Sequence, residues 1–169
     1  MIKRASEAMS GKLITIGWNE PMEKAFELME SHKLRHLPVL DESGNMLGIV
    51  SDRDVQRAMK AELVWAEAIR QKVPSFESVE FDPDAKVRHY MSWPVKSVDY
   101  HTDLRLVAGM MVSEKISAVL VTKNDRHVGI VTTEDLLKVL MSLLGASQER
   151  APIGLDTILA RQGHLGYSW

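Results

Sequence analysis

An internal repeat constrains the fold of this chain more than any other feature of its sequence. The first copy starts with Met-Ser at 9–10 and ends with Gly-Ile-Val-Ser-Asp-Arg-Asp at 48–54. The second copy starts with Met-Ser at 91–92 and ends with Gly-Ile-Val-Thr-Thr-Glu-Asp at 129–135, about 80 residues later. Each copy is long enough to hold several secondary-structure elements, so it is not a short solenoid unit. We therefore expect two copies packed face to face, with functional clefts where they meet.

Composition narrows the class of protein. The 169 residues are enough for one compact unit or for two intimate half-domains. A net charge of −2 argues against general binding to nucleic acid or to a membrane surface, which needs a basic excess. The absence of cysteine excludes disulfides, thiolate catalysis and Cys-ligated zinc. The longest apolar run, at 139–144, is too short to span a bilayer, and no signal-peptide pattern opens the chain. We expect a soluble cytoplasmic protein.

Each copy has the pattern of strand, helix, strand, strand and helix, which predicts an α+β fold. In the first copy we expect strands at 13–16, 36–40 and 46–50, and helices at 22–32 and from Asp52. In the second copy we expect strands at 96–98, 118–122 and 127–131, and helices at 104–115 and 134–144. One copy alone has a small sheet with an apolar face that it cannot bury. Pairing of the two copies should therefore be close to obligatory.

The repeat also sets the predicted domain limits. We place the first domain at 1–60, a connector at 61–86, the second domain at 87–144 and a C-terminal tail at 145–169. Residues 60–73 are expected to prolong the helix that starts at Asp52, until Pro74 breaks it. The tail holds a short apolar-periodic stretch at 155–159, compatible with docking on the chain itself, with disorder or with binding a partner.

The junction between the last strand and the last helix of each copy carries the most chemistry. Both junctions keep Ser/Thr-x-x-Asp, as Ser51 and Asp54 and as Thr132 and Asp135. One interpretation is a capping box, in which the hydroxyl and the carboxylate satisfy backbone N–H groups. Another is a ligand site, where the helix start attracts an anion and the carboxylate accepts from ribose hydroxyls. The two interpretations are compatible.

The glycines that open these junction motifs, Gly48 and Gly129, have a predicted role of their own. A residue without a side chain lets another group come close to the strand. We expect this group to be the ring of a ligand.

Arg53 distinguishes the first junction from the second. A guanidinium beside the junction aspartate, with Arg35 and His36 on the neighbouring strand, is typical of a phosphate clamp. The alternative is a solvated arginine that pairs with a nearby carboxylate. The second copy has Glu134 in place of Arg53, and Ser-Ala at 117–118 in place of Arg-His. The sequence therefore predicts an asymmetric pair of sites, with the phosphate preference in the first.

Signatures of catalysis and of metal binding are lacking. The six histidines show neither the His-x-x-x-His nor the His-Glu-x-x-His spacing of a metal site. There is no Walker loop, no Gly-x-Gly-x-x-Gly and no Gly-x-Ser-x-Gly, and nothing pairs a nucleophile with a base. We therefore expect that the protein is not an enzyme. An enzyme of unrecognised chemistry is the remaining alternative of this kind.

Taken together, these motifs resemble the CBS domain, the regulatory module named for cystathionine beta-synthase. The resemblance rests on Leu-Pro-Val-Leu-Asp at 37–41 and on the two junction motifs, and it covers nearly all of residues 5–144. The stretches at 35–38 and 51–54 are similar to stand-alone bacterial CBS-pair proteins of the acetoin-utilisation type. The second copy departs from the family at Leu120, where proline is usual, and at Glu134, where the best phosphate binders have a basic residue.

The resemblance implies two βαββα domains packed by pseudo-two-fold symmetry into one CBS-pair module. It implies a non-enzymatic regulatory module that requires no cofactor and senses AMP, ADP, ATP or a related adenosyl ligand. Cleft A would hold Ser51, Arg53 and Asp54, with Lys96, Ile116 and Ser117 opposite, and with Arg35 and His36 at its phosphate end. Cleft B, the weaker site, would hold Thr132 and Asp135, with Lys12, Ile14 and Leu34 opposite.

Partners follow from the same resemblance. It implies a homodimer formed through the helices after the last strands, and a regulated protein still to be identified. The alternative is a protein-interaction module with the same fold that binds no small ligand.

Overall fold

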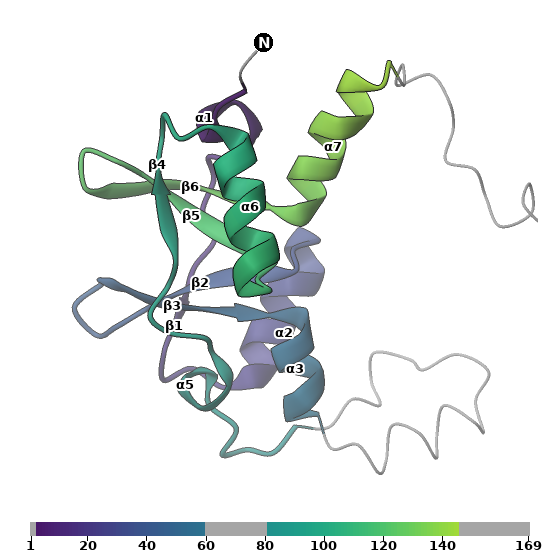
Figure 1. Ribbon diagram of the computed structural model, residues 1–169. Coiled ribbons are helices and arrows are strands. Elements are labelled where there is room, and N and C mark those ends of the chain that lie inside the picture. The colour runs from purple at the N-terminus through teal and green to yellow at the C-terminus, as the bar shows by residue number, and fades with distance from the viewer. Residues whose placement is uncertain (1–2, 60–80, 146–169) are drawn as a thin grey trace, which may run out of the picture.

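The structure, a computed structural model, describes residues 3–59 and 81–145. It consists of two similar halves stacked one on the other, each with its own sheet and helices (Figure 1). The sheets have the strand orders β1-β2-β3 and β4-β5-β6. In each sheet the first two strands are parallel and the last two antiparallel. This architecture confirms the α+β fold predicted from the repeat.

The two halves have the same order of elements. The first half contains β1 (Ile16–Gly17), α2 (Met22–His32), β2 (His36–Leu40), β3 (Met46–Ser51) and α3 (Asp52–Ala58). The second half contains β4 (Ser97–Asp99), α6 (Leu104–Glu114), β5 (Ala118–Lys123), β6 (Arg126–Thr132) and α7 (Thr133–Leu143). A one-turn helix precedes each half, α1 (Ala5–Ala8) and α5 (Val87–Tyr90). The predicted helix at 22–32 and the predicted strand at 36–40 are confirmed.

The first strand of the first half is shorter than predicted, and Pro38 supplies the reason. In the second half the N–H of Leu120 donates to the carbonyl of Lys96 at 3.0 Å, which extends the pairing of β4 with β5. Pro38 takes the place of Leu120 in the first half and has no N–H to donate. The strand β1 therefore pairs only through Ile16 and Gly17, and the predicted strand at 13–16 is wrong for its first three residues.

The helix that starts at Asp52 also ends earlier than predicted. Met59 closes α3 in an extended conformation (φ −69°, ψ 142°) and forms an antiparallel bridge with Phe81. The predicted prolongation of this helix is therefore wrong at Met59. The rest of that prediction, and the predicted tail stretch at 155–159, lie outside the described residues.

The two halves exchange their N-terminal segments. Ser10, at the start of the first copy, pairs with Ile130 of the second half, with N···O distances of 2.9 and 3.1 Å. Ser92 pairs in the same way with Ile49 of the first half, at 2.9 and 3.0 Å. This reciprocal pairing is what a pseudo-two-fold axis between the halves produces.

The glycines that both copies of the repeat share, Gly48 and Gly129, serve this exchange. A β-carbon on Gly48 would lie 2.6 Å from the carbonyl oxygen of Ser92. On Gly129 it would lie 2.9 Å from the carbonyl oxygen of Ser10. The prediction that these glycines admit a ligand ring is therefore wrong, because the exchanged segment approaches them, with its backbone and with the side chains of Met91 at Gly48 and Met9 at Gly129.

The hydrophobic core of each half likewise contains a residue from the segment that precedes the other half in the sequence. Ala5 is fully buried in the core of the second half, and Val87 is fully buried in the core of the first. A third apolar cluster lies where the sheets meet and is built on Ala118, Leu120 and Ile130, with Ile49 and Leu13 packed against it. Each half thus needs the other to complete its core. The domain limits drawn from the sequence remain a prediction, since the packing crosses them.

Helices in the described part of the chain are all short. None of those within residues 3–59 and 81–145 combines the length and the hydropathy that a membrane crossing requires.

Candidate functional site

Two clefts lie between the halves, and each joins a junction of one copy to the first strand region of the other. Cleft A, of about 780 Å³, is lined by the junction of β3 with α3 and by residues around β4 and β5. Of the residues predicted for it, it brings together Ser51, Arg53, Asp54, His36, Lys96, Ile116 and Ser117. Cleft B, of about 210 Å³, brings together all of its predicted residues, Thr132, Asp135, Lys12, Ile14 and Leu34.

The junction carboxylates are held by their own helices. Both the backbone N–H and the hydroxyl of Ser51 donate to Oδ2 of Asp54, each at 2.7 Å. In the second half the N–H and the hydroxyl of Thr132 donate to Oδ2 of Asp135, at 2.9 and 2.7 Å. The capping interpretation is therefore confirmed in both copies. The cap uses one carboxylate oxygen and leaves the other, Oδ1, for a second partner.

A basic side chain from the next helical turn takes up each Oδ1. The guanidinium of Arg57 donates to Oδ1 of Asp54, and the ammonium of Lys138 lies 3.9 Å from Oδ1 of Asp135. Sequence reasoning missed both residues. The available signal was their position three residues after the aspartate, which places the two side chains on the same helix face.

Arg35 does not lie where the resemblance placed it. Its Nε donates to Oδ2 of Asp52 at 2.7 Å, and its side chain lines cleft B rather than cleft A. Neighbouring residues of an extended segment point to opposite sides, so Arg35 and His36 cannot serve the same cleft equally. Cleft B therefore has more positive charge than the sequence predicted, since Lys33, Arg53 and Lys138 also line it.

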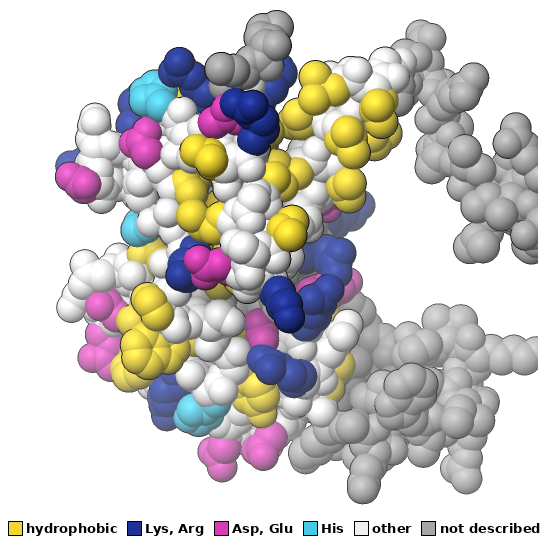
Figure 2. Space-filling view, viewed as in Figure 1, with side chains coloured by type: hydrophobic (Ala, Val, Ile, Leu, Met, Phe, Trp, Pro, Cys, Tyr) yellow, Lys and Arg dark blue, Asp and Glu magenta, His cyan; other side chains and the backbone are white. Residues whose placement is uncertain are grey.

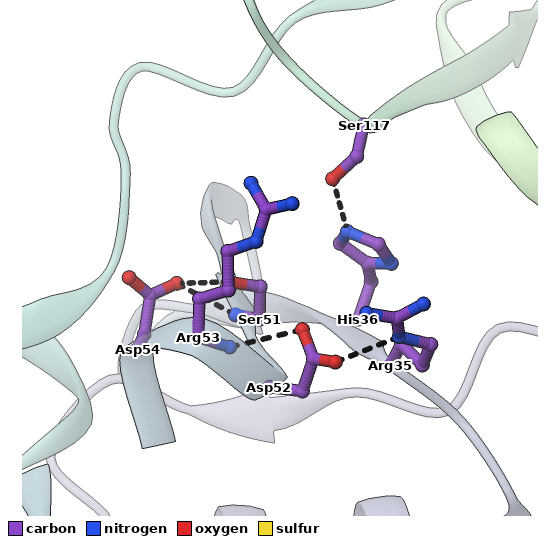
Figure 3. Close-up of polar contacts among 7 residues, drawn as sticks. All are labelled: Arg35, His36, Ser51, Asp52, Arg53, Asp54 and Ser117. Carbon is purple, nitrogen blue, oxygen red and sulfur yellow. Dashed lines mark hydrogen bonds and ion pairs between the residues drawn. The ribbon is translucent and has the colours of Figure 1, made fainter. Parts of the chain in front are cut away.

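His36 stands between the two clefts and lines both. Its Nε2 lies 2.7 Å from the hydroxyl oxygen of Ser117, so that this contact ties β2 to the segment before β5 (Figure 3). Burial lowers the pKa of His36, and it outweighs the neighbouring carboxylate of Asp52, which raises this pKa. The ring is therefore predominantly neutral near pH 7.

Arg53 also lines both clefts, and its guanidinium has no hydrogen bond or ion pair within the described residues. Its backbone N–H donates to Oδ1 of Asp52 at 2.9 Å, while the side chain extends away from that carboxylate (Figure 3). The alternative of a paired arginine thus applies to Arg35 and not to Arg53. The same alternative applies to Lys96, whose ammonium lies 2.8 Å from Oε2 of Glu114.

Glu134 occupies the position of Arg53 in the second half. Its Oε1 lies 2.8 Å from Nζ of Lys138, and this hydrogen bond lowers the pKa of the Glu134 carboxyl. On the face of the molecule that Figure 2 shows, Lys and Arg side chains gather in the space between the two halves. Within the described residues, no group of three or more His, Asp or Glu side chains could hold a metal ion.

Cleft A has one further feature that the sequence did not predict. Trp93, Pro94 and Val95 line it, and Trp93 is 69% exposed. The equivalent place in the first copy is the short segment around Gly11. The larger cleft thus offers apolar surface for a flat ring.

A family model for the CBS domain matches the chain twice, at residues 5–61 and 87–142. An uncharacterised protein of Methanocaldococcus jannaschii is 29% identical over 143 residues, which are 83% of this chain and 32% of that protein. The chain therefore spans about a third of the length of this relative.

Solved structures show the same fold. One is a CBS domain pair in complex with 5′-methylthioadenosine and S-adenosyl-L-methionine; it is 25% identical, with a TM-score of 0.64, over 85% of this chain and 99% of that one. An acetoin-utilization-type protein of Vibrio cholerae is 26% identical, with a TM-score of 0.62, over 90% of this chain and 100% of that one. Both copies of the repeat match the family, the fold is similar to that of these structures, and the chain belongs to the CBS domain family as a tandem CBS pair.

Proposed function

We propose that this CBS pair is a non-enzymatic, cytoplasmic regulatory module that binds an adenine nucleotide or a related adenosyl ligand between its halves. The observation that carries the proposal is the placement of Asp54 and Asp135. Each carboxylate is fixed by its own helix cap through Oδ2, while Oδ1 has as its partner among the described residues a basic side chain that lines the same cleft. A carboxylate held in this way can accept hydrogen bonds from the hydroxyls of a ribose.

The walls of the clefts suit the other parts of such a ligand. In cleft A, Ile116, Val95 and Trp93 supply apolar surface for an adenine ring, and Arg53 supplies an unpaired guanidinium for phosphate. In cleft B, the carbonyl of Ile14 has no donor among the described residues, because Pro38 has no N–H. It can therefore accept from an exocyclic amino group. The related structure with 5′-methylthioadenosine and S-adenosyl-L-methionine supports ligands of this class.

We further propose that the module acts as a homodimer through α7 and regulates a protein that contacts it. Leu137, Leu140, Met141 and Leu143 are exposed on this helix. A large apolar patch of this kind normally marks an interface.

Isothermal titration calorimetry tests the ligand proposal most directly. Wild-type protein is titrated with adenosine, AMP, ADP, ATP, S-adenosylmethionine and 5′-methylthioadenosine, with GMP as the control for the base. The matched protein control is the double variant Asp54→Asn, Asp135→Asn, in which an amide keeps the shape and one acceptor for the cap. Saturable binding of at least one adenosyl ligand to wild type, lost in the double variant, is expected. Absence of binding for the whole panel would leave the interaction module as the function.

A further inference from the structure

The two clefts share one wall. Of the residues that the structure describes, three line both clefts, namely His36, Arg53 and Ser117. His36 and Ser117 come from different halves and are joined by the 2.7 Å contact between Nε2 and Oγ (Figure 3). Groups bound on either side of this wall are therefore close to the same side chains.

Arg53 is the cation of this wall. Most other basic side chains of the clefts belong to ion pairs, Arg35 with Asp52, Arg57 with Asp54, Lys96 with Glu114 and Lys138 with Glu134. Each cleft also has lysines without an ion pair in the described part of the chain, Lys12 and Lys33 in cleft B and Lys115 in cleft A, but each of these lines one cleft only. His36 is predominantly neutral near pH 7, because burial lowers its pKa. Among the described residues, the positive charge common to both clefts thus comes from Arg53 alone.

A guanidinium binds a phosphate best through two parallel N–H groups, and it can offer its best geometry to one phosphate at a time. A second phosphate on the other side of the wall would meet both an engaged Arg53 and the negative charge of the first. We propose that Arg53 is a phosphate anchor shared by the two clefts, so that a phosphorylated ligand in one cleft weakens the binding of a second one in the other. This inference rests on the proposed function. A ligand without phosphate should fill the two clefts independently.

The test measures each cleft alone before it measures both. Asp135→Ala leaves cleft A as the competent site, and Asp54→Ala leaves cleft B. Calorimetric titration of these single-cleft variants with adenosine and with AMP gives the affinity of each cleft for each ligand. Together these values predict the wild-type titration that two independent clefts would give. A difference in affinity between the clefts is already contained in this prediction, so any deviation from it reports coupling.

We expect the wild-type titration with adenosine to follow the independent prediction within about twofold, and the second AMP to bind about tenfold or more weakly than predicted. Arg53→Gln should weaken AMP in both single-cleft backgrounds and leave adenosine nearly unchanged in both. Arg126→Gln is the matched control, because Arg126 is exposed, has no ion pair in the described part of the chain and lines neither cleft. Thermal unfolding of Arg53→Gln verifies that the variant is folded.

Three results would overturn the shared anchor. They are an AMP titration of wild type that follows independent clefts, an effect of Arg53→Gln on AMP in one cleft only, and adenosine binding confined to one cleft. In each case adenosyl binding itself is still observed, so the proposed function stands. Failure of the proposed function looks different, because neither adenosine nor AMP would then bind to wild type at all.

Discussion

The guanidinium of Arg57 donates to Oδ1 of Asp54, the carboxylate oxygen that the Ser51 cap leaves free. A ribose that uses this carboxylate must therefore share it with Arg57 or displace it. Arg57 lies on α3 and lines cleft A itself, so it can remain in the cleft and contact the ligand after the exchange. The capping role and the proposed binding role of Asp54 thus use different oxygens of one group.

Replacement of Asp54 should separate the two roles. A hydrogen bond to a charged group contributes about 1.5–3 kcal/mol, so Asp54→Ala should weaken adenosine at cleft A at least about tenfold. Asp54→Asn can keep the cap through its carbonyl oxygen and should still lose most of the affinity. Calorimetry with adenosine measures both variants. We expect Asp135→Ala to have the smaller effect on total binding, since cleft B is the smaller cleft. An unchanged affinity in Asp54→Ala would exclude the carboxylate from the site.

Replacement of Gly48 should weaken the pairing of the two halves. The new β-carbon of Gly48→Ala would lie 2.6 Å from the backbone oxygen of Ser92, so one of the two segments must shift. We expect a loss of about 1–3 kcal/mol in the free energy of unfolding, measured with urea.

Gly109→Ala is the matched control for this change. Gly109 lies in α6 with nothing within 4 Å of an added β-carbon, and the same substitution there should stabilise by about 0.5–1 kcal/mol. If Gly48→Ala were as stable as Gly109→Ala, the close approach of the exchanged segment would not limit this position.

A charge on α7 should dissociate the proposed homodimer. Figure 2 shows hydrophobic side chains gathered over α7, and Leu140 of this helix is 47% exposed. A charge buried without a partner is strongly unfavourable, so Leu140→Glu should give a soluble monomer in light scattering. Ser43→Glu adds the same charge in the β2–β3 turn and should leave the dimer intact. A dimer that survives Leu140→Glu would place the interface on another surface.

Stability should fall on acidification through His36. Burial lowers the pKa of this ring in the folded protein, whereas the pKa of the same histidine in the unfolded chain is about 6.5. As the pH drops below that value the unfolded chain takes up a proton that the folded protein resists. The contribution of His36 is therefore fully present at higher pH and is lost as the pH falls towards its folded pKa.

Urea unfolding at about pH 7.5 and about pH 5.5 measures this effect. His36→Gln keeps a group able to hydrogen bond with Ser117 and should show a smaller fall in stability between the two pH values. His32→Gln, on the exposed end of α2, should show the same fall as wild type. An equal fall in all three proteins would assign the acid sensitivity to other groups.

Local features of the sequence were sufficient for much of the fold. Apolar spacing placed α2 and β2 at their observed limits, and the two junction motifs predicted the caps on Asp54 and Asp135. These features depend on residues a few positions apart, whose relative placement the backbone geometry of a helix or strand already determines. The length of β1 was also readable in principle, since Pro38 cannot donate to it.

Tertiary structure decided the roles that depend on distant segments. Gly48 faces Ser92 and not a ligand, Arg35 turns to Asp52 and cleft B, and Arg53 lines both clefts. The repeat predicted that the two copies pair, because one small sheet cannot bury its apolar face alone. It did not determine which segments cross between the halves or which side of the shared wall each side chain takes. Those relationships arise between residues far apart in the chain, and they exist only once the two halves have packed against one another.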